Sequence, residues 1–330
     1  MNNLAITTRP STFADVVGQD TAIRVLKRLA MCDEIPCRSI FLKGGWGCGK
    51  TTLARIFARA LNCEHFKERG DVCNECDGCK ESSAKYSMTY REYDSSVVGN
   101  VESIKNLADE LSRPTEYRRL IVFDETHNAS KSAQNALLKM VEDGMPNTIF
   151  MFASTEDILD TLKSRSICLD ITPIPLDLLT RHIVKVANDN GIEIGSQDAQ
   201  QIAVKSKGHV RDAMSLLTQY SLVGAESLST AYRTFGNFIA SLVMGVGDTA
   251  ALRTQLLTYP IRDILDAIAT FLHNGMVATR DDGALYKMAE SKVIATLFNY
   301  FYSTPIQNAM KSERGMELVM LDLTNKLKKR

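Results

Sequence analysis

Short, almost wholly apolar runs recur through the first half of the chain and predict the strands of a buried sheet. They lie at residues 40–42, 120–123, 149–153 and 167–171. Continuous hydrophobicity of this kind is typical of parallel strands that are covered on both faces. Residues 88–93 instead alternate polar and bulky side chains, which predicts one more strand.

Between these runs the apolar positions repeat at helical spacing. Over residues 21–31 the apolar side chains would share one face of a helix. Further helices are predicted over residues 52–61 and 101–111, and after Ser130, whose hydroxyl can cap a helix. Strands that alternate with helices over residues 39–171 predict an α/β fold built on a doubly wound parallel sheet.

The second half of the chain has a different pattern. From residue 176 onward the periodicity is helical, and no strand signal of comparable strength recurs. We expect three domains, which suits the length of 330 residues. An α/β domain would span residues 1–172, a small helical domain 173–235, and a second helical domain 236–330.

The residues after the first apolar run fit the phosphate-loop pattern G-x-x-x-x-G-K-[ST]. In order they are Gly44, Gly45, Trp46, Gly47, Cys48, Gly49, Lys50 and Thr51, followed by Thr52. Glycines let successive backbone N–H groups surround phosphate oxygens, and the helix that begins at the lysine directs the positive end of its dipole toward them. Lys50 would reach the β- and γ-phosphates of a nucleotide, and Thr51 would offer its hydroxyl to Mg²⁺. The alternative interpretation is a glycine-rich turn between a strand and a helix.

Two carboxylates follow the apolar run at 120–123. Asp124 would hold Mg²⁺, and Glu125 would orient and deprotonate an attacking water. An Asp-Glu pair at the end of a strand is common, and a solvated strand end is the alternative. Its place downstream of a phosphate loop favours the catalytic interpretation.

Four cysteines lie close together in residues 62–80, a region with few apolar side chains. They are Cys63, Cys73, Cys76 and Cys79. Gaps of two residues let neighbouring thiolates bind one ion, and zinc favours four such ligands in a tetrahedron. Metal binding would then supply the folding energy of this segment. A redox pair or four free thiols are the alternatives, although a redox pair needs only two cysteines.

Composition changes this picture little. The chain has 39 basic and 39 acidic residues, so its formal net charge of zero gives no global sign of nucleic-acid binding. The longest apolar stretch, residues 238–246, is too short to span a bilayer. The first thirty residues lack the apolar core of a secretory signal. We expect a cytoplasmic protein, in a bacterial or an infected cell.

Several single residues carry little signal by themselves. Arg165 and Arg211 would ordinarily be surface charges, and Ser154 and Thr155 would be turn residues after a strand. Cys48 differs, because a thiol close to a helix N-terminus and to a lysine is expected to have a lowered pKa. We therefore expect alkylation of Cys48 to block nucleotide binding.

Together these motifs resemble those of the AAA+ ATPase subunits of sliding-clamp loaders, in particular the gamma/tau subunits of bacterial DNA polymerase III. The matching segments cover residues 9 to about 220 in the family's order. They are Arg9-Pro10 through Gln19, the phosphate loop, the four-cysteine insert, Asp124-Glu125-x-His127, residues 135–139, Ser164-Arg165 and Gly208-x-x-Arg211-Asp212-Ala213. The insert is the most discriminating of these, because eukaryotic-type loader subunits lack it.

The resemblance implies roles that the residues alone leave open. Arg165 would be an arginine finger that reaches the ATP of a neighbouring subunit. Arg211 would be the sensor-2 arginine that contacts nucleotide in its own subunit. Ser154 or Thr155 would be sensor 1.

It also implies cofactors and partners. The segment from Arg9 to Gly18, with Arg9 and Val17 as its binding residues, would line the adenine pocket, and the cofactors would be ATP, Mg²⁺ and Zn²⁺. Residues 173–235 would form a lid, and residues 236–330 a collar that holds a pentamer of loader subunits. The assembly would use ATP binding and hydrolysis to load a sliding clamp onto primer–template DNA during replication.

The resemblance has departures, and other functions compete with it. Ser166 replaces the usual cysteine after Arg165, and residues 97–100 replace a turn that carries basic residues toward DNA. The chain ends near residue 330, as a short form of the subunit would, bacterial or viral. Alternative functions are a nucleotide-binding scaffold without hydrolysis and a DExH-type helicase; the zinc insert and the lack of a second motor domain weigh against the helicase.

Overall fold

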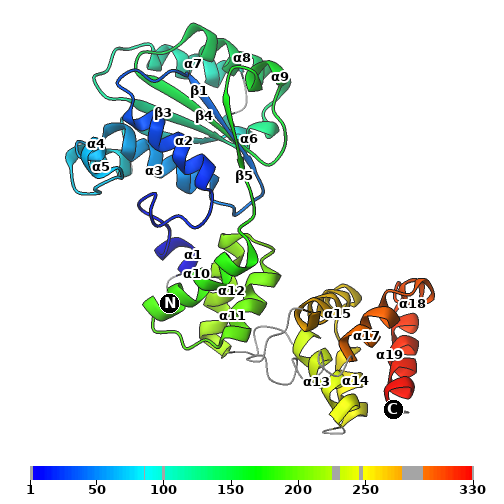
Figure 1. Ribbon diagram of the computed structural model, residues 1–330. Helices are drawn as coiled ribbons and strands as arrows, with labels where there is room; N and C mark the ends of the chain where they lie inside the picture. The colour runs from blue at the N-terminus through cyan, green and yellow to red at the C-terminus, as the bar shows by residue number, and fades with distance from the viewer. Residues whose placement is uncertain are drawn as a thin grey trace. The chain divides into compact units, whose positions relative to one another are not determined.

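The computed structural model describes residues 3–84, 86–98, 101–224, 231–244, 248–276 and 293–328. The chain forms two compact units, Met1–Leu222 and Val223–Arg330 (Figure 1). The boundary predicted at residue 235 falls inside a helix of the second unit, α13 (Ala231–Met244). The division into three domains therefore remains a prediction.

The first unit is built on a five-stranded sheet in which every neighbouring pair of strands is parallel. The strands are β1 (Ser39–Gly44), β2 (Tyr90–Asp94), β3 (Arg119–Asp124), β4 (Thr148–Ser154) and β5 (Ile167–Ile171). Their order is β2-β3-β4-β1-β5. Each coincides with a run expected from the sequence, so the predicted parallel sheet is confirmed. Because β1 pairs with both β4 and β5, the loop that follows β1 starts from the interior of the sheet.

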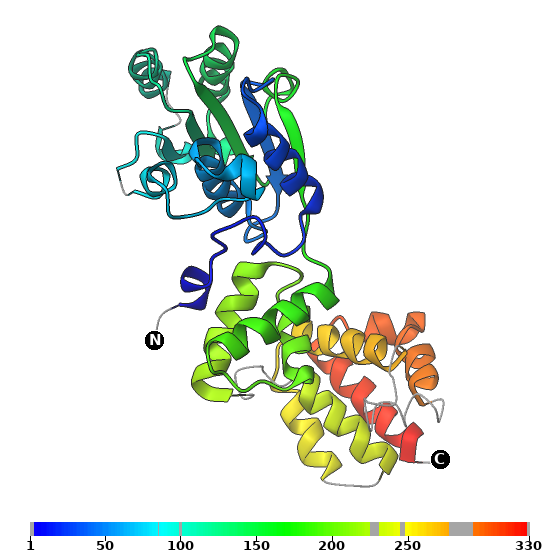
Figure 2. The same cartoon turned by 60° about the vertical axis from the view of Figure 1, so that its left-hand side comes forward.

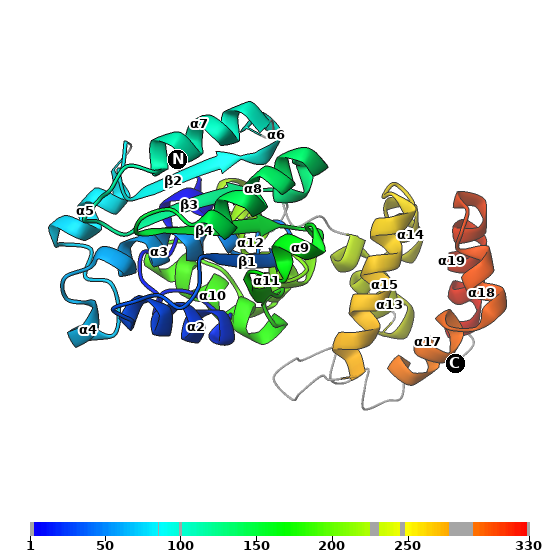
Figure 3. The same cartoon turned by 90° about the horizontal axis from the view of Figure 1, so that it is seen from above.

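Helices cover both faces of this sheet, as seen from above in Figure 3. One face packs against α2 (Asp20–Met31) and α3 (Lys50–Asn62). The other packs against α7 (Val101–Leu111) and α8 (Lys131–Asp143). Helix α8 begins as predicted at Ser130, whose hydroxyl accepts a hydrogen bond from the backbone of the third residue beyond it at 3.2 Å.

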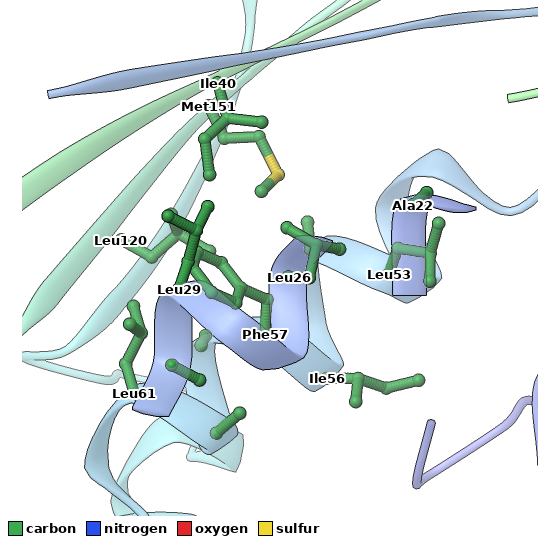
Figure 4. Packing of buried hydrophobic residues seen from close by; sticks show 14 of the residues in the cluster. Ala22, Leu26, Leu29, Ile40, Leu53, Ile56, Phe57, Leu61, Leu120 and Met151 are labelled. Atoms are coloured by element: carbon green, nitrogen blue, oxygen red, sulfur yellow. The ribbon is translucent and has the colours of Figure 1, made fainter. Parts of the chain in front are cut away.

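Successive side chains of β1 point to opposite faces of the sheet and so contribute to the hydrophobic cores on both faces. Ile40 and Leu42 face α2 and α3, whereas Phe41 between them faces α7 and α8. Figure 4 shows how Leu26 of α2 and Phe57 of α3 meet the strand residues in the first of these cores. Fully burying a side chain of this size contributes about 1.5–3 kcal/mol. The helix after the phosphate loop is therefore fixed firmly to the sheet.

Shorter elements connect these layers. They are α1 (Leu4–Thr7), α4 (Phe66–Arg69), α5 (Asp77–Ser83), α6 (Ser95–Val98), the 3₁₀ helix η1 (Thr126–Asn128) and α9 (Asp160–Lys163). Helix α5 lies against the end of α3, and a Cβ added to Gly78 would lie 1.9 Å from the carbonyl oxygen of Asn62. Only glycine allows so close an approach. Of the turn singled out at 97–100, Gly99 and Asn100 lie outside the described residues.

The first unit ends in three helices, α10 (Leu176–Asp189), α11 (Ser196–Lys205) and α12 (Val210–Val223). The N-terminus of the chain reaches this layer, because the Leu4 N–H donates to Thr218 Oγ1 at 3.2 Å. Figure 2 shows the dark-blue N-terminal segment running between the sheet and these green helices. The segment thus touches two layers of the unit.

The second unit is helical throughout the part that the structure describes. Its elements are α13, α14 (Thr249–Leu256), α15 (Ile261–Met276), α17 (Val293–Phe301), α18 (Thr304–Ala309) and α19 (Glu313–Lys328). The core is aromatic: Phe235 packs edge-on against Phe271 and Phe301, with ring centroids 5.4 and 5.8 Å apart. Among the described helices of both units, none combines the length and apolarity that a bilayer span requires.

Candidate functional site

The phosphate-loop motif forms a tight loop between β1 and α3. Gly47 and Gly49 adopt φ values of +73° and +104°, a region that favours glycine. At the start of the loop, a Cβ on Gly44 would lie 2.2 Å from the carbonyl oxygen of Ile171 on β5. The glycines are therefore required by the fold at three points. The loop ends at Lys50, the first residue of α3, so the N-terminus of a long helix points into it.

Lys50 is the central cation of the loop. Its Nζ donates to the carbonyl oxygens of Gly44 and Gly45 at 2.8 and 3.1 Å, and the residue is buried. Burial lowers the pKa of Lys50, while the carboxylates of Glu125 and Asp124 act in the opposite direction. A partly desolvated ammonium of this kind gains from an anionic partner.

A hydroxyl and a carboxylate meet beside this lysine. Thr51 Oγ1 donates to Asp124 Oδ2 at 3.3 Å. They come from the first turn of α3 and the carboxyl end of β3, two elements that the sheet holds in place. Oxygen ligands of these two kinds are what Mg²⁺ takes in sites that also bind phosphate. The donor set therefore fits the ion expected from the sequence.

Glu125 lies next to this pair in an unusual backbone conformation, with φ at +48°. Its Oε1 accepts a hydrogen bond from Trp46 Nε1 at 3.0 Å. Its Oε2 is buried without a hydrogen bond and lies 3.5 Å from His127 Nδ1. A strained backbone and an unsatisfied carboxylate oxygen together are typical of a functional position.

His127 links Glu125 to the end of β4. Its Nδ1 lies 2.8 Å from the hydroxyl oxygen of Ser154, which is fully buried. Thr155, the next residue, is half-buried, and neither it nor Ser154 lines the pocket. Of the two sensor-1 candidates left open by the sequence, Ser154 is the one that His127 connects to Glu125.

The start of α12 packs directly onto the phosphate loop. The Arg211 N–H donates to the Gly47 carbonyl at 3.4 Å. Cys48 Sγ lies 3.3 Å from His209 Nδ1, and a Cβ on Gly45 would lie 2.8 Å from the same ring. Residues about 160 positions apart in the chain thus share one wall of the site.

One pocket collects most of the predicted site residues. Those that line it are Arg9, Val17, Trp46, Gly47, Cys48, Gly49, Lys50, Thr51, Thr52, Asp124, Glu125 and Arg211. Gly44 and Gly45 do not line it, but their carbonyl oxygens accept the hydrogen bonds of Lys50. Pro10 and Val16, which also line it, belong to the segment expected from the resemblance to face adenine. Residues that sequence reasoning missed complete the walls: Ala5, Thr8, His182, Val210 and Met214. Single residues of these types carry no motif, so only the fold reveals them.

Three cations converge on this pocket. Burial lowers the pKa of Arg9, and the neighbouring Arg55 and Arg211 lower it further. Arg211 likewise acts to lower the pKa of Lys50. Cations that lower one another's pKa are brought together at a cost, which an anion would offset. The pocket therefore combines positive charge, a metal-type oxygen pair and a partly apolar wall from Val16, Val17 and Met214, as a nucleotide polyphosphate requires.

The four cysteines of the insert converge at a second place in the first unit. All four sulfurs lie within 4.8 Å of one another. Cys63 and Cys79 lie 3.6 and 3.9 Å, respectively, from Cys73, close to the roughly 3.8 Å edge of a tetrahedron with 2.3 Å metal–sulfur bonds. Burial acts to raise the pKa of Cys73, but backbone N–H donors from Glu75 and Cys76 outweigh it and lower the pKa to about 6. The cluster could hold a zinc ion.

Comparisons with known proteins agree with this geometry. The family described as "DNA polymerase III, delta subunit" matches residues 18–175. The DNA polymerase III subunit gamma/tau of Mycoplasma pneumoniae is 32% identical over 217 residues, which are 64% of this chain and 31% of that protein. The gamma subunit of Buchnera aphidicola is 31% identical over 225 residues, 67% of this chain and 60% of that one.

The chain is gamma/tau-like. It spans about a third of the Mycoplasma protein and less than two thirds of the Buchnera protein. Among solved structures, the Thermotoga maritima RuvB Holliday junction branch migration motor aligns with a TM-score of 0.52 over 82% of this chain and 79% of that chain, at 19% identity. That likeness shows an AAA+ fold for the gamma/tau-like chain.

One expectation for the loop of this gamma/tau-like chain was wrong. The thiol of Cys48 was expected to have a lowered pKa. Burial instead raises the pKa of Cys48, and the nearby charge of Lys50 only partly opposes this. The side chain is 2% exposed. A helix N-terminus and a lysine do not activate a thiol that the fold removes from water.

Arg165 lies outside the pocket. It comes just before β5, at the amino end of the strands, and its Nη2 lies 2.6 Å from Glu142 Oε1. Its Nη1 also donates to the Thr161 carbonyl at 3.0 Å. The phosphate loop follows the carboxyl end of β1, whose six residues span about 17 Å at 3.3 Å per residue. Arg165 of the gamma/tau-like chain is therefore separated from its own Lys50 by the length of the sheet.

Proposed function

We propose that this chain is an ATPase subunit of a DNA polymerase clamp loader. The observation that carries the proposal is the convergence of Lys50, the Thr51–Asp124 pair and Glu125 in one pocket, beside Arg9 and Arg211. The gamma/tau relatives and the AAA+ fold support a replication role for such a site.

The residues of the pocket would divide the work of ATP hydrolysis. Lys50 would exchange its hydrogen bonds to Gly44 and Gly45 for phosphate oxygens, and Arg211 would hold the same phosphates from α12. Thr51 and Asp124 would hold Mg²⁺, which when bound neutralises phosphate charge. The segment with Arg9 and Val17 would receive the adenosine.

Glu125 would orient the attacking water and accept its proton on Oε2. In the fold that oxygen is buried and receives no hydrogen bond, so turning it toward the attacking water would displace no hydrogen-bond donor from it. The Trp46 indole donates a hydrogen bond to the other oxygen of Glu125. His127, bonded to the Ser154 hydroxyl, lies beside the carboxylate and would help to orient it.

A neighbouring subunit would complete the site. Arg165 is exposed at the far end of the sheet, where a second subunit could meet it. We propose that its guanidinium reaches the γ-phosphate bound by a neighbour, as an arginine finger does. Each subunit would then supply most of one site and a single arginine to another.

The remaining parts would serve assembly. Cys63, Cys73, Cys76 and Cys79 would bind a structural zinc ion. Residues 173–235 would act as a lid that carries Arg211, and residues 236–330 as the collar of a pentameric loader. Its partners would be the other loader subunits, the sliding clamp and primer–template DNA.

The test is ATP turnover measured together with nucleotide binding, with and without a sliding clamp and primed DNA. Turnover that clamp and DNA stimulate, and that Glu125→Gln abolishes while binding is kept, is the expected result. Binding without any turnover in the assembled complex would instead make the chain a nucleotide-dependent scaffold. Strand separation without a clamp would indicate a helicase.

A further inference from the structure

The wall of the pocket that would face adenosine is a segment without regular secondary structure. Arg9, Pro10, Val16 and Val17 line the pocket, and residues 9–17 between α1 and α2 are called the strap here. A segment of this kind has few backbone hydrogen bonds of its own, so its position depends on what other elements hold it.

The strap is held at its centre by Asp71, which belongs to the cysteine insert. The two carboxylate oxygens of Asp71 accept the N–H groups of Phe13 and Ala14 at 3.0 and 2.9 Å. Asp71 also accepts a hydrogen bond from Lys27 of α2 at 3.3 Å. Two consecutive backbone groups are thus fixed by one side chain 58 and 57 positions further along the chain.

Neighbouring contacts join the strap and the insert at the same place. The buried ring of Phe13 meets the ring of Phe66 edge-on, with centroids 6.4 Å apart. Asn74 Nδ2 donates to Ser11 Oγ at 3.3 Å. Asp71 and Asn74 lie within two residues of Cys73, whose sulfur is 3.6 and 3.9 Å from those of Cys63 and Cys79.

Just beyond the strap, Gln19 is bonded to the residue that follows β5 rather than to the insert. Gln19 Nε2 donates to the Thr172 carbonyl at 2.6 Å, and Gln19 Oε1 accepts from the Thr172 N–H at 3.2 Å. Both ends of the strap are therefore joined to other elements, α1 before Arg9 and the Gln19–Thr172 pair beyond Val17, whereas its centre is held by Asp71.

We infer that Asp71 is a positioning residue for the nucleotide pocket, and that it couples metal binding by the four cysteines to nucleotide binding. The inference rests on the proposed nucleotide site. A metal ion would fix the loop between Cys63 and Cys76, and with it the carboxylate that places Phe13 and Ala14. Because coupling between two sites is reciprocal, a bound nucleotide would in turn strengthen retention of the metal.

The experiment compares Asp71→Asn with the parent protein and with a matched control, Glu68→Gln. Glu68 is an exposed carboxylate of the same insert, on α4, and its replacement removes the same charge. Asp71→Asn replaces one acceptor with an N–H donor that faces the strap. Affinity for a fluorescent ADP with Mg²⁺ should fall by about 5- to 50-fold, as expected when a part-buried N–H loses its acceptor. Zinc content should stay at that of the parent.

A second measurement tests the coupling without any variant. Release of zinc from the parent protein to a chromogenic chelator is followed with and without saturating ADP and excess Mg²⁺. ADP should slow the release by a factor of about 5 or more, within the usual range of coupling between sites. In Asp71→Asn the same nucleotide should give no protection, whereas Glu68→Gln should behave as the parent.

The outcomes separate the two proposals. A parent protein that binds no ADP overturns the nucleotide site itself. A parent that binds ADP but releases zinc at one rate with and without it overturns the coupling alone. Equal ADP affinity of Asp71→Asn and Glu68→Gln overturns the role of Asp71.

Discussion

The two edges of the parallel sheet carry different parts of one proposed reaction. At the carboxyl edge, the loop after β1 and the ends of β3 and β4 bring a lysine, two carboxylates and a buried serine together. At the amino edge, Arg165 lies on the surface in an ion pair with Glu142. The first edge forms a pocket, whereas at the second the Arg165 side chain is exposed and pairs with a surface carboxylate.

The difference teaches which contacts a single chain can satisfy. Residues at the carboxyl edge bond to one another: Thr51 to Asp124, Trp46 to Glu125, and His127 to Ser154. The Arg165 guanidinium is bonded to the Thr161 carbonyl, the Ser164 hydroxyl and the exposed carboxylate of Glu142, and such exposed ion pairs contribute about 0–1 kcal/mol. Exchange of Glu142 for a phosphate on another subunit would therefore cost little.

The largest expected effect comes from the amino edge. In the assembled loader, Arg165→Ala should lower ATP turnover by about 10³-fold or more, because an arginine finger stabilises charge that develops in the transition state. Nucleotide affinity of the isolated subunit should not change. Steady-state turnover and equilibrium binding measure the two quantities.

Mixed complexes sharpen this prediction. A subunit with Arg165→Ala should hydrolyse ATP at its own site when a parent subunit is its neighbour. Arg24→Ala, at an exposed arginine of α2, is the matched control and should leave turnover unchanged. Loss of hydrolysis at the variant's own site would contradict action on a neighbour.

At the carboxyl edge, Glu125→Gln should lower turnover by about 10²- to 10⁴-fold with nucleotide binding retained, because a base is lost while its shape is kept. Glutamine can still accept the Trp46 hydrogen bond. Glu156→Gln, at an exposed carboxylate after β4, is the control and should turn over normally. Single-turnover hydrolysis with a binding titration would decide, and weakened binding by Glu125→Gln would argue against a purely chemical role.

Lys50→Ala should act on binding. Loss of charge-assisted hydrogen bonds to phosphate should weaken nucleotide affinity by about 10- to 100-fold. Lys43→Ala removes a half-buried lysine near the end of β1, one that pairs with Asp157, and should change affinity little. Titration calorimetry compares them, and equal affinities for the two variants would remove Lys50 from the site.

The smallest effect is one of pH. Hydrogen bonds from Lys163 and Lys43 lower the pKa of Asp157 to about 2. Because this lies below the unfolded value of about 3.9, ionised Asp157 stabilises the fold above about pH 4, and the stabilisation is lost as pH falls toward 2. The group is exposed, so the effect is slight. Between pH 5 and 2 the midpoint temperature of thermal unfolding should fall a little less steeply for Asp157→Asn than for the parent. Identical pH profiles would contradict the assignment.

The sheet could be predicted from the sequence because its signals are local. Continuous apolar runs mark β1, β3, β4 and β5, and glycines at 44, 47 and 49 mark the loop that the fold requires. The spacing of the four cysteines was also enough to predict that they cluster, because cysteines so close in the chain have few other arrangements for their sulfurs.

What the sequence could not supply depends on contacts between distant residues. Two contacts join elements that are far apart in the chain: His127 with Ser154, and His209 with Cys48. No local sequence pattern predicts contacts of this kind. The pKa of Cys48 was misjudged for the same reason, because burial by other elements outweighs the charge of its neighbour in the chain. The domain boundary predicted at residue 235 lies within α13, whereas the two compact units divide between Leu222 and Val223, next to Gly224.

Trp46 is the single tryptophan of the chain and lies at the mouth of the pocket, 69% exposed. Its indole N–H is directed at Glu125, the proposed base. Fluorescence of an indole responds to the water and charge around it, so this protein has an intrinsic optical reporter on its phosphate loop. A ligand that draws Glu125 away from the ring would register in the emission spectrum within the mixing time of a stopped-flow instrument, and no attached dye would be required.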